Sequence, residues 1–125
     1  IRDAQESRGL GDVYKRQLID SAKDYVHRNY RSVDLGLDDT CKELGVSNSY
    51  FSSLFKKETG SSFVEYLTDY RMDKAARMLV ETDDKSYVIA QNVGYADPNY
   101  FSYVFKRKYG VSPSRYRTEY EKNKV

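Results

Sequence analysis

The sequence has few of the residues that build covalent cross-links, metal centres or membrane spans. Its 125 residues include one cysteine, one histidine, two prolines and no tryptophan. One cysteine excludes an internal disulfide, and one histidine beside it gives no set of metal ligands at a typical spacing. No apolar run approaches the roughly 18 residues that a membrane-spanning helix needs. The sequence therefore predicts a cytoplasmic protein that binds no metal or other cofactor.

Motifs for catalysis are also missing. We find no paired carboxylates at a defensible spacing, no phosphate-binding loop and no nucleophile motif. The sequence accordingly predicts no enzyme activity and no catalytic residue.

The charged residues are unevenly distributed. The formal net charge is only +2, which is weak evidence for a polyanionic partner. From Pro98 onward, however, the sequence contains seven lysines and arginines but only two glutamates, whereas the span 37–60 is about neutral. The second half of the chain should therefore attract phosphate groups more strongly than the first.

A duplicated segment dominates the sequence. Tyr50–Tyr66 and Tyr100–Tyr116 are identical at eight of seventeen aligned positions. Each copy follows a short turn that contains a glycine, Gly45 or Gly94. Two copies are too few for a solenoid, so the duplication indicates a module that acts twice on one partner.

Both copies show the pattern of an amphipathic helix. At 100° per residue their apolar residues fall on one side. These residues are Phe51, Leu54 and Phe55 in the first copy, and Phe101, Val104 and Phe105, joined by Lys108, in the second. The opposite sides carry Ser49, Ser52, Ser53 and Lys56 in the first copy, and Asn99, Ser102, Tyr103 and Lys106 in the second. Each copy is therefore predicted to be a helix that two phenylalanines anchor and that presents a polar side to a groove.

Capping residues divide the chain into about seven predicted helices. Ser47, Ser86, Asp97 and Ser112 are the expected N-caps, and Ser62 with Glu65 resembles a capping box. The expected helices cover 17–30, 37–44, the first repeat up to Gly60, 63–82, 87–93, the second repeat from Pro98 to Gly110, and 113–120.

These helices predict an all-α fold with two helix-turn-helix subdomains, residues 17–61 and 83–125, joined by a long linker helix, residues 62–82. Residues 1–16 lack apolar periodicity and are interpreted as a flexible or non-native leader. A linker helix of twenty residues is ~30 Å long, and major-groove segments on one face of B-DNA recur every ~34 Å. Both repeated helices are thus predicted to enter adjacent major-groove segments of one duplex.

Residues 18–117 resemble the AraC/XylS-type DNA-binding domain. The motifs that carry the resemblance are Leu44-Gly45-Val46-Ser47, Tyr50-Phe51-Ser52, Phe55-Lys56-Lys57-Glu58-Thr59-Gly60, Tyr66-Leu67, Arg71, Ala75, Val93-Gly94-Tyr95, Tyr100-Phe101-Ser102, Phe105-Lys106, Gly110-Val111-Ser112-Pro113 and Tyr116-Arg117. The segment 93–103 is most similar to output domains of two-component response regulators. The resemblance implies a bacterial transcription factor that binds double-stranded DNA and whose receiver or effector domain lies N-terminal to this chain.

By position, the resemblance assigns base-facing roles to Ser49, Ser52 and Ser53 in the first repeated helix and to Asn99, Ser102 and Tyr103 in the second. Lys56, Lys57, Lys106 and Arg107 are expected near phosphates, where they position the protein without reading sequence. Family members often carry arginine, glutamine or tryptophan at several of the base-facing positions. Because a serine hydroxyl discriminates less between bases than a bidentate side chain, we expect most specificity to come from the second helix, with Asn99 reading adenine.

One alternative stays open at this point. The near-neutral first half also fits a helical protein-interaction module that docks on a partner such as RNA polymerase. DNA binding through several phosphate contacts weakens steeply as salt rises, whereas docking by a helix of little net charge changes far less.

Overall fold

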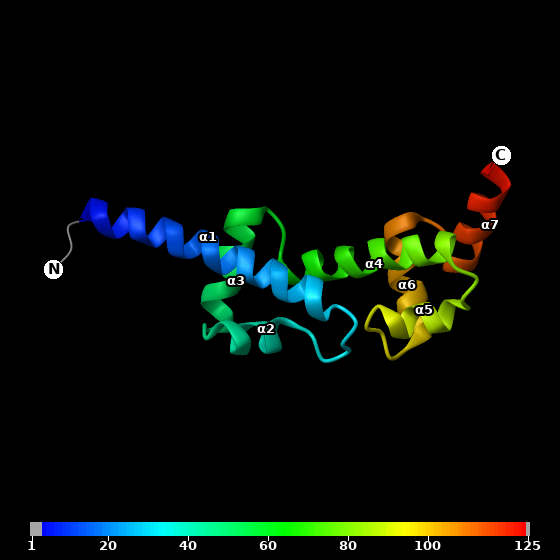
Figure 1. Cartoon of the computed structure of the whole chain (residues 1–125), viewed down its shortest axis with the longest axis horizontal. Coiled ribbons are helices and arrows are strands. Elements are labelled where there is room, and N and C mark those ends of the chain that lie inside the picture. The colour runs from blue at the N-terminus through cyan, green and yellow to red at the C-terminus, as the bar shows by residue number, and fades with distance from the viewer. Residues whose placement is uncertain (1–3, 125) are drawn as a thin grey trace. The chain divides into compact units, whose positions relative to one another are not determined.

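The computed structural model describes residues 4–124, and their side chains from residue 11 onward, as seven α-helices (Figure 1). They are α1 (Ala4–Asn29), α2 (Leu37–Leu44), α3 (Asn48–Thr59), α4 (Phe63–Glu81), α5 (Ser86–Asn92), α6 (Pro98–Tyr109) and α7 (Pro113–Asn123). No strand occurs in the described part of the chain, and the predicted all-α class is confirmed. None of these helices is long and apolar enough to cross a bilayer.

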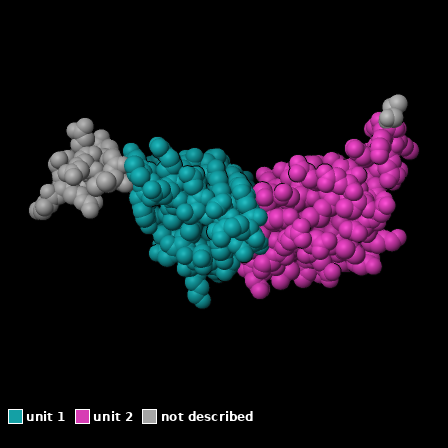
Figure 2. Space-filling model, viewed as in Figure 1, with its two compact units in different colours: residues 1–29, 36–66 teal, residues 30–35, 67–125 magenta. Residues whose placement is uncertain are grey.

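The chain divides into two compact units, which Figure 2 shows in different colours. Unit 1 consists of residues 1–29 and 36–66, and unit 2 of residues 30–35 and 67–125. Helix α4 contributes its first residues, up to Tyr66, to unit 1 and the remainder to unit 2. The segment predicted to be a separate linker is therefore part of both units.

Side-chain caps fix the starts of both repeated helices. The Ser47 hydroxyl accepts a hydrogen bond from the Tyr50 backbone N–H at 3.2 Å, as an N-cap of α3 should. The Asp97 carboxylate accepts one from the Asn99 N–H at 2.9 Å, and Pro98 occupies the first turn of α6. Both predicted N-caps are thus confirmed.

The same two helices end alike. Gly60 follows α3 with φ +85°, and Gly110 follows α6 with φ +82°. Each glycine N–H donates to a carbonyl in the last turn of its helix, at 2.9 Å for Gly60 and 2.7 Å for Gly110. This left-handed conformation favours glycine, so the glycine spacing correctly predicted both ends.

Aromatic packing holds α3 in unit 1. Phe51 and Phe55 are fully buried, and their ring centroids lie 5.4 and 5.5 Å from that of Phe63 at the start of α4. The Phe55 ring also meets the Tyr66 ring edge-on at 5.6 Å. Buried aromatic pairs of this kind add to the free energy of burial, so the orientation of α3 about its own axis is well determined.

Unit 2 repeats this packing around α6. Phe101 and Phe105 are fully buried, and Phe105 meets Tyr116 of α7 edge-on at 5.4 Å. Phe105 and Tyr116 stand at the same positions of the duplicated segment as Phe55 and Tyr66 in the first copy. The remaining core residues come from α4, from α5 and from the residue that follows α5: Met72, Ala75, Ala76, Leu79, Ile89, Ala90 and Val93. The duplication seen in the sequence is therefore a duplication of the core.

Several predicted boundaries were wrong, most of them by a single residue. Helix α1 begins at Ala4 and not at Gln17, so the predicted flexible leader is helical from residue 4 onward. Extending an existing helix costs little per residue, and no proline interrupts residues 4–16. Ser86 is the first helical residue of α5 and not its N-cap, because Lys85 takes the N-cap position. Helix α7 continues past Tyr120 to Asn123.

Candidate nucleic-acid interface

Helix α3 exposes the side that the sequence predicted. Ser49 and Ser53 are exposed and Ser52 is half-buried, while the opposite side is buried in the core of unit 1. Lys56 and Lys57 are exposed in the last turn. The structure therefore brings all five side chains to one outer region of unit 1, and their roles toward a ligand stay predictions.

Helix α6 shows the same arrangement with larger side chains. Asn99 and Tyr103 are exposed, Tyr103 by 56% of its surface, and Ser102 is half-buried. Lys106 and Arg107 are exposed in the last turn. Ser52 and Ser102, which occupy matching positions in the two copies, are the least exposed of the predicted base-facing residues. A ligand that touches α6 thus meets an aromatic and an amide where α3 offers serines.

Four cations lie on these faces, in the last turns of α3 and α6. Among the described residues, no ion pair includes Lys56, Lys57, Lys106 or Arg107. Uncompensated cations in the last turn of each helix give both units a positive region beside the polar face. Such a region attracts phosphate groups.

Lys108 differs from these cations because it belongs to the packing of unit 2. Its ammonium group lies 2.8 Å from the Asp73 carboxylate and donates to the Asp69 carbonyl at 3.2 Å. Tyr109 donates to the same Asp73 oxygen at 2.7 Å. Partial burial opposes ionisation of Asp73, but these two hydrogen bonds outweigh it and hold its pKa below the ordinary value. The contacts tie the end of α6 to α4, on the inner side where the sequence had placed Lys108.

A buried arginine fixes the segment that precedes α2. The Arg71 guanidinium donates from Nε to the Tyr30 carbonyl at 3.0 Å and from Nη2 to the Ser32 carbonyl at 2.7 Å. It also lies over the Tyr95 ring, 5.4 Å from the centroid. Burial lowers the pKa of Arg71, but an arginine remains charged at neutral pH. Arg71 thus joins α4, residues 30–35 and the turn before α6 into one structure within unit 2.

Gly94 lies directly against this arginine. Its φ is +95°, and a Cβ added there would lie 2.6 Å from the Tyr30 carbonyl oxygen and 2.7 Å from Arg71 Nη2. The turn between α5 and α6 therefore requires glycine for two reasons, its backbone conformation and the lack of space. The sequence had indicated only that this glycine lies in a short turn.

Lys15 of α1 lies beside the outer face of α3, and sequence reasoning missed it. A shallow pocket of about 390 Å³ is lined by Lys15, Ser49, Tyr50, Ser53, Leu54 and Lys57. Lys15 was overlooked because residues 1–16 were set aside as a leader. Its spacing was the available signal, since Lys15 precedes the buried residues Leu18 and Ile19 by three and four positions and so shares their face of the helix.

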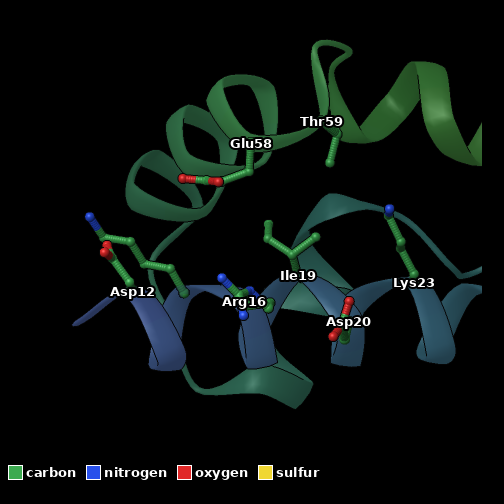
Figure 3. Close-up of a pocket in the computed structure, with 8 residues that line it drawn as sticks. Asp12, Arg16, Ile19, Asp20, Lys23, Glu58 and Thr59 are labelled. Atoms are coloured by element: carbon green, nitrogen blue, oxygen red, sulfur yellow. The ribbon is translucent and has the colours of Figure 1, made fainter. Parts of the chain in front are cut away.

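A second pocket, of about 630 Å³ and also lined by Lys15, lies between α1 and the end of α3 (Figure 3). Glu58 and Thr59 face α1 there, with Ile19 between the helices. The charged residues that line it balance, three acidic and three basic: Asp12, Asp20, Glu58, Lys15, Arg16 and Lys23. This pocket lacks the one-signed charge that would attract a polyanion, and we place it outside the interface.

Comparison with known proteins agrees with this geometry. Residues 40–119 match the family described as helix-turn-helix domain. The chain is 36% identical over 80 residues to the lactose operon transcription activator of Staphylococcus xylosus, which is 64% of this chain and 28% of that protein. The chain spans about a third or less of the length of this and other curated relatives.

Solved structures show the same fold. The C-terminal domain of AraT, a response regulator from Geobacillus stearothermophilus, superposes with a TM-score of 0.80 at 39% identity, over 82% of this chain and 84% of that one. The DNA-binding domain of AdpA, a global transcriptional factor solved in complex with a target DNA, has a TM-score of 0.80 at 22% identity, over 85% and 95% of the two chains. The chain belongs to the helix-turn-helix family of the AraC/XylS type, the DNA-binding domains of transcription regulators.

Proposed function

We propose that the chain binds a specific site on double-stranded DNA by placing α3 and α6 in the major groove. The observation that carries the proposal is the matched design of these helices. In each unit two buried phenylalanines hold a helix whose outer side presents polar groups, followed by uncompensated cations in the last turn. An α-helix fits the major groove of B-DNA, and cations at its end reach the flanking phosphates.

We further propose that both helices engage one duplex and that no second copy of the chain is needed. Helix α4 is uninterrupted over 19 residues, about 28 Å, and successive major-groove segments on one face recur every ~34 Å. The test begins with selection of binding sites from random duplex DNA. Inserting about five base pairs between the two contacted segments turns one of them to the opposite face. We expect this insertion to abolish tight binding and an insertion of a full turn to weaken it less. Equal binding to all three duplexes would contradict the proposal.

Asn99→Ala is expected to relax sequence preference. The exposed Asn99 side chain is suited to a bidentate contact with adenine, and such a contact discriminates by about 1–3 kcal/mol. Site selection with the variant should lose an adenine at one position of the α6 segment. Ser49→Ala, at the matching position of α3, is the control and should change the selected sequence much less. Retention of the adenine by the Asn99 variant would refute its assignment.

Lys15→Ala is expected to weaken binding to all duplexes to a similar extent. Lys15 lies beside Ser49 and Ser53, at the edge of the α3 face, where a phosphate flanking the groove would pass. Removing one phosphate contact lowers the slope of log affinity against log salt by about 0.9. Arg16→Ala, which removes the same charge from the neighbouring charge-balanced pocket, is the control. An unchanged slope for Lys15→Ala would exclude the contact.

We infer that the chain is the cytoplasmic output domain of a larger response regulator, that its action is binding and not catalysis, and that it needs no cofactor. Support comes from its similarity to the C-terminal domain of a response regulator and from the small share of its relatives that it spans. Sequencing the coding region upstream of this chain tests the inference. A receiver domain is expected there, and a metabolite-binding domain would contradict the response-regulator assignment. Contact with RNA polymerase remains a separate prediction.

A further inference from the structure

Arg107 and Tyr103 form a pair on the outer side of α6. Arg107 Nη1 donates a hydrogen bond to the Tyr103 hydroxyl at 3.1 Å, and the guanidinium carbon lies 5.8 Å from the centre of the Tyr103 ring. The two residues are four positions apart and therefore adjacent on the helix surface. Both are exposed, so the pair faces solvent and not the core of unit 2.

Tyr103 also contacts a second aromatic ring. The Tyr100 ring stacks on it at a centroid distance of 6.3 Å and an interplanar angle of 27°. Tyr100 in turn lies 6.0 Å from Tyr95, the ring that covers the buried Arg71. A row of aromatic contacts thus connects the exposed tyrosine to the rigid interior of unit 2, which limits the rotamers open to Tyr103.

These contacts orient the Arg107 guanidinium but occupy few of its hydrogen-bond donors. A guanidinium has five N–H donors in a planar fork, and the structure commits one of them to the Tyr103 hydroxyl. No carboxylate among the described residues pairs with Arg107. A side chain held in position before binding loses less entropy when it binds, and the planar fork matches the N7 and O6 acceptors of guanine.

We propose that Arg107 reads a guanine in the major groove and that Tyr103 positions it for this contact. The assignment replaces the phosphate contact that the sequence had predicted for Arg107, and it rests on the proposed function. Asn99, Tyr103 and Arg107 recur every four residues and so share one face of α6. At the positions of Tyr103 and Arg107, α3 carries Ser53 and Lys57, which form no such fork. The guanine-reading pair is therefore a property of the second half-site alone.

Arg107→Lys tests the proposal because it keeps the charge and removes the fork. We expect site selection with this variant to lose a guanine at one position, and affinity for the wild-type site to fall about 5- to 150-fold, the range for one bidentate pair. Replacing that guanine with 7-deazaguanine should weaken the wild-type protein and leave the variant nearly unaffected. Lys106→Gln, a neighbouring cation without an aromatic partner among the described contacts, is the control and should weaken all duplexes equally.

Tyr103→Phe separates positioning from simple packing. It keeps the ring and removes only the hydroxyl that holds Arg107, so it should reduce the guanine preference in the wild-type background and have no further effect on that preference in the Arg107→Lys background. Guanine preference that survives Arg107→Ala, which removes every donor of the side chain, would show that Arg107 does not read the base and would overturn the inference. If the wild-type protein selects no sequence at all, the proposed function itself fails.

Discussion

Gly94→Ala is expected to lower the free energy of unfolding of unit 2 by about 3–5 kcal/mol. The added Cβ would lie 2.6 Å from the Tyr30 carbonyl oxygen and 2.7 Å from Arg71 Nη2, too close for either atom to remain in place. Overpacking of this kind costs about 1–3 kcal/mol, the left-handed backbone adds about 1–2 kcal/mol, and displacement of Arg71 weakens its hydrogen bonds to two carbonyls. Urea unfolding followed by circular dichroism measures the loss.

Gly45→Ala is the matched control for this prediction. Gly45 ends α2 with φ +71° and a Cβ there would meet no atom within 4 Å. Only the backbone cost of about 1–2 kcal/mol applies. The two glycines precede the two copies of the duplicated segment, so the comparison isolates the combined steric effect of the Tyr30 carbonyl and Arg71. If the two substitutions lowered the free energy of unfolding equally, the atoms around Gly94 would have to move aside for the added Cβ with no loss of stability, which would contradict the prediction.

Simultaneous substitution of Lys56, Lys57 and Lys106 by glutamine is expected to change DNA binding most. These lysines are exposed in the last turns of α3 and α6, and no ion pair in the described part of the chain neutralises them. Each phosphate contact contributes about 0.9 to the slope of log affinity against log salt. The slope should therefore fall by about 2.7, with affinity lost for every duplex and the selected sequence unchanged. Titrations at several salt concentrations measure both quantities.

A charge-matched variant controls for the long-range effect of net charge. Lys85, Lys122 and Lys124 are equally exposed but lie before α5 and at the end of α7. Substituting these three by glutamine removes the same charge, and we expect a much smaller change in slope. Equal slopes for the two triple variants would mean that α3 and α6 hold no privileged phosphate contacts. Weak salt dependence of the unmodified protein would instead favour the protein-docking alternative.

Local chemistry predicted the helices that bear the candidate site. The caps Ser47 and Asp97 and the end glycines Gly60 and Gly110 act within a few residues of one another, and such short-range effects can be recognised in a sequence. The spacing of the phenylalanines likewise predicted which side of each helix is buried. The start of α1 could not be predicted in this way, because its first turns lack an apolar stripe and contain Gly9. Tertiary context and cheap helix extension outweigh such weak local signals.

The features that the sequence did not predict all depend on distant contacts. Arg71 meets carbonyls about forty positions earlier in the chain, and the lack of space at Gly94 follows from that contact. Lys15 approaches Ser49 because α1 packs near α3. The Tyr103–Arg107 pair is local, but the helical pattern alone gave Arg107 the generic role of a cation near phosphate. Its hydrogen bond to Tyr103 distinguished it from Lys106.

Residues 30–35 belong to unit 2 although α2 and α3, which follow them in the chain, belong to unit 1. During synthesis on the ribosome this segment emerges well before Arg71, whose side chain later holds the Tyr30 and Ser32 carbonyls. The nascent chain can complete the Phe51–Phe55–Phe63 core before Arg71, which binds the loop ahead of α2, has been synthesised. The residues of unit 1 end at Tyr66, so the loop acquires its hydrogen bonds to Arg71 only after all of unit 1 has been synthesised.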